Sequence, residues 1–371
     1  MKNDQVQLSE QSDRVMSIDA LRGFDMFWII GGAKIFSGFH TLYNNSVTTF
    51  INTQFEHVPW EGFRFEDLIF PLFLFIVGAV FPFSLTKRIE QGQSRTGITF
   101  HIIKRGILLI LIGMILNGLM DFDFQNMRWC GVLQRIGLCY LIGALIVTYT
   151  RWQWQAAIAG TILLLYWLAA MLIPVPEYGA GVMTPEGCLS SYVDQLILPG
   201  KLYYGYGDNE GLLSTLPAVS TLLIGVLSGH WLRSDRSQIK KTVGLAVAGI
   251  CSLSLGLLWS TVFPIIKIIW TSSYVLVAAG WSLLLLALFY LIIDVLKFRT
   301  WAFFFIVIGA NAITIYVLHW IIDFNDIALY LLGGLAKMAG AGANLVMAIG
   351  VIIIEWLLLL LLYRKKIFIK V

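Results

Sequence analysis

Ionisable side chains gather at the mouth of a long apolar segment in the first quarter of the chain. The stretch 56–78 reads EHVPWEGFRFEDLIFPLFLFIVG, in which His57, Glu61, Glu66 and Asp67 precede the hydrophobic run. Charged groups are costly at the edge of a bilayer core, so a cluster of them there is a functional-site hypothesis by default. Imidazole titrates near neutral pH, and a carboxylate can orient its ring. We predict a catalytic His57 with Asp67 as its partner; the alternative is a solvated loop histidine.

Pro59 and Trp60 follow His57 directly and restrain its loop. An aromatic ring and a carboxylate beside a reactive imidazole can hold a polar substrate. Trp60 and Glu61 are therefore candidate substrate-binding residues.

Cationic side chains near the start of two apolar segments are candidate anion ligands. Asp19, Arg22 and Asp25 are spaced three residues apart, so that Arg22 can pair with either carboxylate on one helix face. Arg22 is either part of a structural ion-pair stripe or a guanidinium that binds phosphate near the cytoplasmic face. Lys104 and Arg105 can hold the same anion from another helix, or can simply anchor its inner end.

Polar residues inside apolar runs need a partner or a wet cavity. Gln134 and Arg135 lie just inside the apolar segment that starts near residue 131, and Asn311 lies near the middle of a later one. Arg135 requires a carboxylate or a ligand anion, whereas Asn311 can bridge helices. Glu355 raises the same question, without a specific role.

A loop at 174–212 combines tyrosines, glycines and carboxylates. Tyrosine faces beside carboxylates can bind a sugar, or an amino sugar through its ammonium group. Tyr204 and Asp208 are the candidate residues. The alternative is an aromatic belt at the membrane surface.

The cysteines indicate no metal site. Cys130 and Cys188 both fall in loops expected outside, where a disulfide is permitted, but the sequence does not fix their separation. No His, Cys, Asp or Glu cluster has metal-ligand spacing, and we predict that no metal is bound.

The elements that position these residues are predicted to be membrane helices. Of the 371 residues, 58% are hydrophobic and 13% charged, against roughly 25% charged in soluble domains. Apolar runs long enough to cross a bilayer recur along the chain. We predict an all-α polytopic membrane protein of about ten transmembrane helices, at about 17–37, 65–86, 101–120, 131–150, 153–173, 212–232, 241–263, 271–293, 300–322 and 343–363.

Lysine and arginine concentrate in alternate loops, which predicts a multi-pass protein of the inner membrane with both termini cytoplasmic. Residues 1–14 then form a cytoplasmic tail and 15–371 a single transmembrane domain, with outer loops at about 38–64 and 174–212. The modest net charge of +4 lies in short loops, which makes nucleic acid an unsuitable partner. Membrane lipids are expected partners, and a homodimer is left open.

The chain resembles the heparan-α-glucosaminide N-acetyltransferase family of transmembrane acyltransferases, in a bacterial form. The most specific motif is the block at 56–78 quoted above. Weaker motifs follow the family's order across nearly the whole chain: SIDALRG at 17–23, GVLQRIGLCY at 131–140, LPGKLYYGYGDNEGLLSTLP at 198–217, WTSSYVLVAAGW at 270–281 and GANAITIY at 309–316.

The resemblance implies transfer of an acetyl group from cytoplasmic acetyl-CoA, as co-substrate, to an amino sugar on the periplasmic side. The family's catalytic histidine falls on His57, and its coenzyme-associated arginine falls on Arg135. Lysosomal members carry an asparagine near the outer end of the first span, whereas this chain reads WIIGGAKIF there. The sugar acceptor therefore need not be heparan sulfate. Two alternatives remain: an O-acetyltransferase of an envelope polysaccharide, and a secondary transporter of a sugar or small anion.

Overall fold

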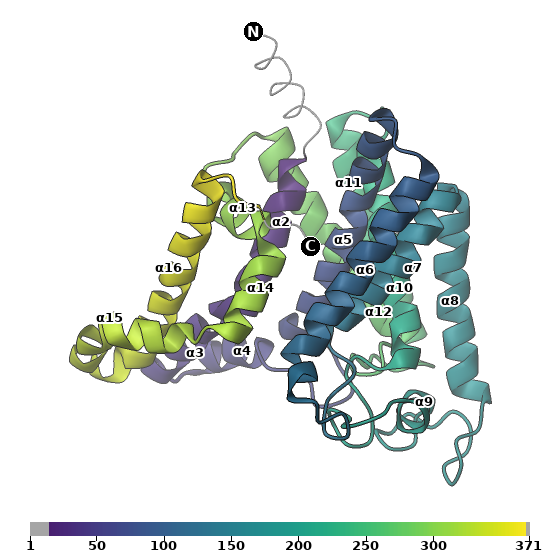
Figure 1. The fold of residues 1–371 in the computed structure, drawn as a ribbon, viewed down its shortest axis with the longest axis horizontal. Helices are drawn as coiled ribbons and strands as arrows, with labels where there is room; N and C mark the ends of the chain where they lie inside the picture. Colours follow the sequence, from purple (N-terminus) through teal and green to yellow (C-terminus); the bar gives the residue numbers. More distant parts are fainter. Residues whose placement is uncertain (1–14, 369–371) are drawn as a thin grey trace. The chain divides into compact units, whose positions relative to one another are not determined.

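The computed structural model describes residues 15–368, so the predicted tail at 1–14 lies outside the described residues. All regular secondary structure in this range is helical (Figure 1). The chain divides into two compact units. Unit 1 contains the described residues of 1–56, 236–244 and 285–370, and unit 2 contains 57–235 and 245–284. We describe each unit by itself, and the prediction of one domain stays a prediction.

Unit 2 is built from long apolar helices joined by an extended loop region. The helix α10 packs against α5, α7, α8 and α9, and α6 packs against α7. Two of the helices, α11 and α12, contribute one end to unit 1. The bounds are α5 Phe65–Glu90, α6 Arg95–Leu116, η2 Leu119–Asp121, α7 Val132–Tyr149, α8 Trp152–Leu172, α9 Leu189–Ile197, α10 Leu212–Arg233, α11 Gln238–Trp259 and α12 Ser272–Phe289.

Glycines allow the two central helices of unit 2 to touch backbone to backbone. A Cβ placed on Gly225 of α10 would lie 2.0 Å from the carbonyl oxygen of Phe75 in α5. A Cβ on Gly78 of α5 would lie 2.0 Å from the carbonyl oxygen of Leu222. Small residues at such crossings are how membrane helices gain van der Waals contact, since lipid supplies little hydrophobic drive.

Unit 1 contains two helices that are broken by backbone kinks. The first is interrupted at Gly31, whose φ of +121° is available to glycine without strain. The second is bent by 70° between α13 and α14, at Asn311. The bounds are α2 Met16–Phe27, η1 Trp28–Gly32, α3 Ala33–Leu42, α4 Ser46–Gln54, η3 Tyr290–Val295, α13 Ala302–Ala310, α14 Ala312–Ile321, α15 Phe324–Met338, η4 Gly340–Gly342 and α16 Ala343–Arg364.

Glycines also bring α2 and α13 together in unit 1. A Cβ on Gly23 would collide with the carbonyl oxygen of Phe305, and one on Gly309 would lie 2.3 Å from that of Asp19. The helix α16 packs against α3, α13 and α15. The helix α15 crosses the end of α16 (Figure 1).

The prediction of an all-α polytopic membrane protein is confirmed. Within residues 15–368, eight helices are long and apolar enough to span a membrane, and the bent pair α13–α14 is a ninth if it counts as one span. The count of about ten differs at the first predicted span, 17–37. That segment is helical, but it is broken at Gly31 and carries several charged side chains, so it does not qualify.

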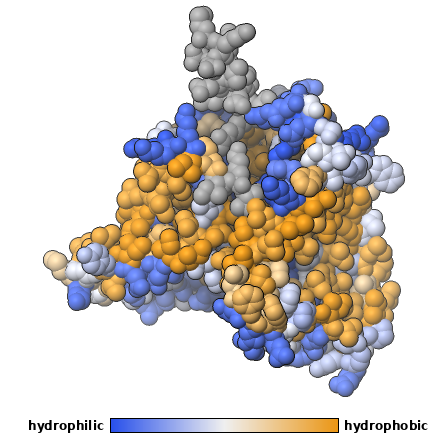
Figure 2. Space-filling view, in the orientation of Figure 1, coloured by the Kyte–Doolittle hydropathy of each residue, from blue (hydrophilic) through white to orange (hydrophobic). Residues whose placement is uncertain are grey.

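Helices also form inside segments predicted as loops. The loop at 38–64 contains α4, the loop at 174–212 contains α9, and α15 occupies the connection that precedes the last span. On the face of unit 2 seen in Figure 2, a hydrophobic band lies between hydrophilic ends. Exposed apolar residues of α6 and α8, such as Ile107, Leu111, Leu164 and Leu168, are consistent with contact to lipid acyl chains.

The Gly225 crossing can be tested by adding one methyl group. We expect Gly225→Ala to destabilise unit 2 by roughly 1–3 kcal/mol or more, because the new Cβ must displace the α5 backbone. The measurement is the thermal unfolding midpoint of the protein in detergent. Gly160→Ala in α8 is the control, since nothing lies within 4 Å of its added Cβ. Equal midpoints for wild type and Gly225→Ala would contradict the packing.

Candidate active site

Three ionisable side chains of unit 2 meet at the start of α5. The Nδ1 atom of His57 lies 3.1 Å from Oδ1 of Asp67 and 3.1 Å from Nζ of Lys267. The Nζ atom of Lys267 lies 3.4 Å from the same carboxylate oxygen. The side chain of Asp67 is 1% exposed and that of Lys267 14%, whereas that of His57 is 56% exposed. A buried carboxylate thus holds a lysine and an accessible imidazole.

The Asp67 carboxylate is held in place by backbone N–H groups of the loop that precedes α5. Its Oδ2 accepts hydrogen bonds from the backbone N–H groups of Arg64, at 3.1 Å, and Val58, at 3.5 Å. The bond from Arg64 satisfies a backbone donor at the N-cap of α5, where an acidic side chain is favoured, and the bond from Val58 joins the preceding loop to the same carboxylate. The hydroxyl of Tyr274 in α12 donates to the backbone carbonyl of Asp67 at 2.7 Å.

Backbone contacts fasten the rest of the His57 loop to distant segments of unit 2. The indole N–H of Trp60 donates to the carbonyl of Met183 at 2.7 Å. Glu61 forms an isolated bridge with Ile266, which places its backbone beside the segment that carries Lys267. The side chain of Glu61 is exposed.

The position of the proton on His57 decides what its ring can do. If Nδ1 carries the proton, it donates to Asp67 and leaves the lone pair of Nε2 available. If Nδ1 is unprotonated, it accepts from the Lys267 ammonium and Nε2 carries the proton. The first arrangement is the one that suits a base or a nucleophile.

Lys267 is a site residue that the sequence prediction missed. Burial lowers its pKa below the ordinary range, against the opposite effect of Asp67, Glu66 and Glu210. Its signal was a single lysine inside the apolar stretch IIKIIW, a context in which a charge needs a partner.

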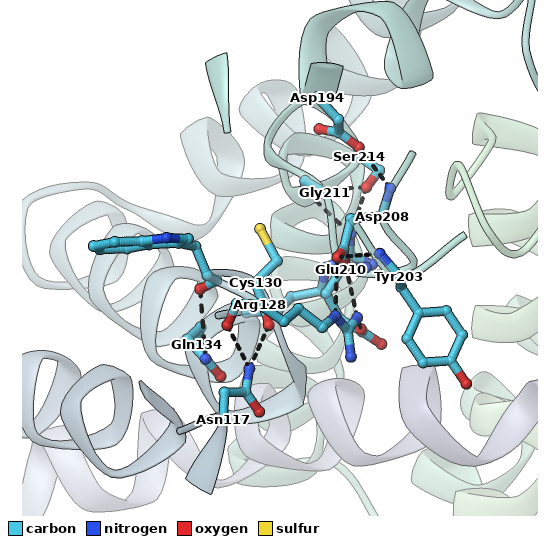
Figure 3. Close-up of polar contacts among 12 residues, drawn as sticks. Asn117, Arg128, Cys130, Gln134, Asp194, Tyr203, Asp208, Glu210, Gly211 and Ser214 are labelled. Atoms are coloured by element: carbon cyan, nitrogen blue, oxygen red, sulfur yellow. Dashed lines mark hydrogen bonds and ion pairs between the residues drawn. The ribbon is translucent and has the colours of Figure 1, made fainter. Parts of the chain in front are cut away.

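A second charged cluster lies in the loop region of unit 2 (Figure 3). Arg128 donates from Nε to Oδ2 of Asp208 at 2.9 Å and from Nη2 to Oδ1 at 2.6 Å, and Nη2 also donates to Glu210. Its guanidinium carbon lies 4.5 Å above the ring of Tyr203. Burial disfavours the charge, yet the two carboxylates hold the pKa of Arg128 above its ordinary range. Arg128 is a second residue that the sequence prediction missed, although the acidic loop at 174–212 needed a cation.

Asp194 of α9 orders the turn that carries these carboxylates. Its two oxygens accept from the backbone N–H groups of Asp208, at 3.2 Å, and Leu212, at 2.9 Å. Burial raises the pKa of Asp194 to about 6, partly opposed by these two hydrogen bonds.

Arg135 is buried at the start of α7 and is only partly satisfied. Its Nη2 donates to the hydroxyl of Ser214 and to the carbonyl of Gly211 at 3.2 Å, and its guanidinium carbon lies 4.8 Å above the ring of Trp270. Its Nε and Nη1 atoms are buried without a hydrogen-bond partner among the described residues. Arg135 was predicted to require either a carboxylate or a ligand anion. No carboxylate of the described residues forms an ion pair with it, so the ligand anion is the alternative that remains.

The neighbouring Gln134 contacts the backbone of the loop that precedes α7. Its Nε2 points to the carbonyl of Trp129 at 3.5 Å, and the amide of Asn117 donates to the carbonyls of Arg128 and Cys130 (Figure 3). Cys130 and Cys188 are both free, buried thiols, and no disulfide joins them. Burial raises the pKa of the Cys130 thiol to about 12, so it is unreactive at neutral pH.

The other predicted anion ligands are distributed over both units. Arg105, in α6 of unit 2, lies over the ring of Tyr140 and has a buried, unpartnered Nε; Lys104 precedes it. Arg22, in unit 1, pairs with Asp19 at 2.5 Å and with the carbonyl of Gly309 at 2.9 Å. The predicted Asp19–Arg22 pair is confirmed, whereas an anion shared by Arg22 and the α6 cations stays a prediction.

Two other polar residues of unit 1 have found structural partners. Asn311 donates from Nδ2 to the carbonyl of Ile367 at 3.1 Å, beside the α13–α14 bend. Glu355 is 0% exposed, and its Oε1 accepts from Nδ1 of His319 at 2.7 Å.

The tyrosines predicted to bind a sugar pack against one another. Tyr204 stacks on Tyr206 with ring centroids 5.4 Å apart, and Tyr203 meets Tyr204 edge-on. Trp60 meets Tyr206 edge-on at 6.2 Å. The predicted substrate-binding residue Asp208 is already paired with Arg128 and lacks an open carboxylate for a ligand ammonium.

Comparison with known proteins identifies related sequences. A family model described as "Heparan-alpha-glucosaminide N-acetyltransferase, catalytic" matches residues 14–259. The heparan-alpha-glucosaminide N-acetyltransferase of Homo sapiens is 25% identical over 428 aligned positions, which cover 98% of this chain and 61% of the relative. That of Mus musculus is 27% identical over 377 positions, which cover 84% and 54%. The chain thus spans less than two thirds of the length of these relatives.

The raised pKa of Asp194 predicts a pH-dependent stability. Because the folded-state value of about 6 lies above the ordinary value near 4, the stabilisation is complete below about pH 4 and is lost as the pH rises through 6. The stability of wild type relative to Asp194→Asn should therefore fall across this window, by up to roughly 3 kcal/mol. Thermal unfolding of both proteins at several pH values measures the difference. For the exposed control Asp235→Asn the difference should stay constant, and a constant difference for Asp194→Asn would refute the assignment.

Proposed function

Because the chain belongs to the heparan-alpha-glucosaminide N-acetyltransferase catalytic family, we propose that it is a transmembrane acetyltransferase. It takes the acetyl group from acetyl-CoA on the cytoplasmic side of a bacterial inner membrane. The acceptor is an amino sugar of the glucosamine type on the periplasmic side. The observation that carries the proposal is the His57–Asp67–Lys267 cluster, in which a buried carboxylate orients an accessible imidazole.

His57 supplies the proton chemistry of the transfer. With Nδ1–H donating to Asp67, Nε2 accepts a proton from the sugar amine as the nitrogen attacks the thioester carbonyl carbon. The carbon–sulfur bond then breaks, and the thiolate of CoA receives that proton. In the alternative route Nε2 itself attacks the thioester carbonyl carbon, and the carbon–sulfur bond breaks to release CoA thiolate and leave an acetyl-imidazole. The sugar amine then takes the acetyl group as the carbon–Nε2 bond breaks, and the proton that the amine loses goes to the CoA thiolate.

Arg135 is the residue that best fits a role in binding acetyl-CoA. Its Nε and Nη1 atoms are buried without a partner among the described residues, and an Arg in this setting favours an anionic or carbonyl oxygen. Gln134 lies beside it, and Lys104 and Arg105 offer positive charge for phosphate from α6. Arg22 and Asn311 belong to unit 1, and their predicted role in binding the coenzyme stays a prediction.

Trp60, Tyr204 and Tyr206 are proposed to hold the sugar ring, because aromatic faces bind the apolar faces of carbohydrates and Trp60 lies three residues from His57. Acetyl-CoA is too charged to diffuse through lipid, whereas its pantetheine arm is long and thin. A nucleotide held near the inner face can therefore extend its thioester toward His57.

Two other functions remain candidates. An O-acetyltransferase of an envelope polysaccharide would use the same residues on a hydroxyl group. A secondary transporter of a sugar or small anion is favoured by the bent pair α13–α14 and the buried His319–Glu355 pair of unit 1, since broken helices and intramembrane ionisable groups are typical of transporters.

Replacement of His57 tests the proposed reaction directly. We expect His57→Ala to reduce acetyl transfer from acetyl-CoA to glucosamine by roughly 100-fold or more, because the group that accepts the amine proton is removed. The measurement is the release of CoA thiol and of labelled N-acetylglucosamine by purified protein in liposomes. His40→Ala, with its ring hydrogen-bonded to Thr48, is the control and should retain activity. Wild-type protein that moves sugar across the liposome but releases no CoA would favour the transporter.

A single turnover with labelled acetyl-CoA and no acceptor separates the two routes of transfer. Label retained on His57 supports the acetyl-imidazole, and its absence supports direct attack.

Lys267 is expected to be needed for the proposed reaction. Lys267→Met removes a side-chain partner of the buried Asp67 carboxylate, which also holds His57. We expect kcat/KM for acetyl transfer to fall in Lys267→Met, whereas Lys201→Met, which removes an exposed lysine, should leave it unchanged. An unchanged kcat/KM in Lys267→Met would show that the lysine does not support the base.

A further inference from the structure

The charges around Lys267 are unevenly satisfied. Three carboxylates act on this lysine: Asp67, Glu66 and Glu210. Asp67 is held by His57, by Lys267 and by backbone N–H groups, and Glu210 is held by Arg128. Glu66 is different, since its Oε2 atom is buried without a hydrogen-bond partner among the described residues.

Glu66 occupies the position next to Asp67 in the first turn of α5. Its side chain is half-buried, and the adjacent Asp67 contacts both His57 and Lys267. A carboxylate oxygen withdrawn from water without a donor is costly, so a donor supplied by a ligand stabilises it. This open acceptor belongs to the residue that directly precedes Asp67, whose carboxylate contacts the imidazole that is proposed to react.

We propose that Glu66 binds the ammonium group of the acceptor and so selects an amino sugar over a neutral one. The inference rests on the proposed function, and it names the class of substrate: a saccharide with a free, protonated amine. Glucosamine in this role supplies up to three N–H donors and a positive charge, whereas a hydroxyl supplies one donor and no charge.

The other acidic residues near the site do not fit this role as well. Asp208 and Glu210 already accept hydrogen bonds from the Arg128 guanidinium, and Asp208 also accepts from the backbone N–H of Glu210, so their oxygens have partners within the protein. The face of Tyr203 is covered by the same guanidinium. Glu61 is exposed, where a single ion pair with a ligand contributes little.

Binding as an ammonium is compatible with the chemistry that follows. The nitrogen loses one proton to solvent and becomes the neutral nucleophile beside His57. It loses the second to Nε2 of His57 as the carbon–nitrogen bond forms and the carbon–sulfur bond breaks, and His57 returns that proton to the CoA thiolate. The ammonium and acetyl-CoA thus give the N-acetyl sugar, CoA thiol and one proton released to water.

The test combines ligand binding with turnover, so that the two proposals can fail separately. Binding of glucosamine and of glucose to the full-length protein in detergent is measured by calorimetry, and transfer from acetyl-CoA is measured in parallel. Glu66→Gln should weaken glucosamine binding by roughly 10- to 100-fold and raise its KM accordingly, with kcat little changed. Glucose binding should not change. The defect should shrink at high pH, where glucosamine is neutral.

Matched variants separate binding from folding. Glu90→Gln removes an exposed carboxylate at the other end of α5 and should behave as wild type. Glu66→Asp, which keeps the charge, should restore part of the affinity if Glu66→Gln lowers the unfolding midpoint. Unchanged glucosamine affinity in a folded Glu66→Gln protein would overturn the inference. Wild-type protein that binds glucosamine through Glu66 but transfers no acetyl group would overturn the proposed function instead.

Discussion

The buried carboxylate of Asp67 is the interaction on which the candidate site depends. A carboxylate that is 1% exposed must be compensated on every side, and the protein does this with a lysine, an imidazole and backbone N–H groups from its own loop. Each compensating bond also fixes a position: the backbone bonds shape the loop 57–64, and the ring of His57 is aligned by Oδ1. The cost of burying one charge thereby organises three segments of unit 2 around the reactive group.

These contacts are kept only if the helix that carries Asp67 is held rigidly in place. That rigidity comes from α5 and α10, whose backbones touch at Gly78 and Gly225 with no side chain between them. Such packing leaves few alternative rotamers to adjust, so the N-terminal turn of α5 is held by the helix behind it. Tyr274 of α12 adds a hydrogen bond to the same turn. The contact between α5 and α10 therefore helps to fix the position of the N-terminal turn of α5, which carries Asp67.

Some buried polar groups of unit 2 are paired within the protein and others are not. Arg128 with Asp208 and Glu210 forms a hydrogen-bonded, stacked cluster that shapes the loop after α9. Among the described residues, Arg105 and Arg135 keep buried donors without a partner, and Glu66 keeps a buried acceptor without one. Buried groups that the protein leaves unsatisfied are where ligands gain most, because the desolvation of the protein group has already occurred. The unpaired N–H groups of Arg135 suit an anionic or carbonyl oxygen, such as those of acetyl-CoA. The unpaired oxygen of Glu66 suits a cationic group, such as the ammonium of an amino sugar. Acetyl transfer to an amine requires both kinds of substrate.

The sequence by itself determined what depends on local composition and short spacing. Among the described residues, eight of the ten apolar segments became single helices close to the expected extent, and a ninth became the bent pair α13–α14, because hydrophobic length decides which segments fit a bilayer. The His57–Asp67 pair could also be predicted from the sequence, since only ten residues and one helix start separate its members.

The tertiary structure decided the contacts between residues that are far apart in the sequence. Lys267 lies 210 residues from His57, and Arg128 lies 80 residues from Asp208, so no periodicity connects them. Folding also decided the partners of two carboxylates: Asp208, a predicted substrate-binding residue, is paired with Arg128, whereas Glu66 keeps a buried oxygen with no partner among the described residues. Which charge remains available depends on which partners the packed helices bring within reach, and that is a property of the assembled bundle.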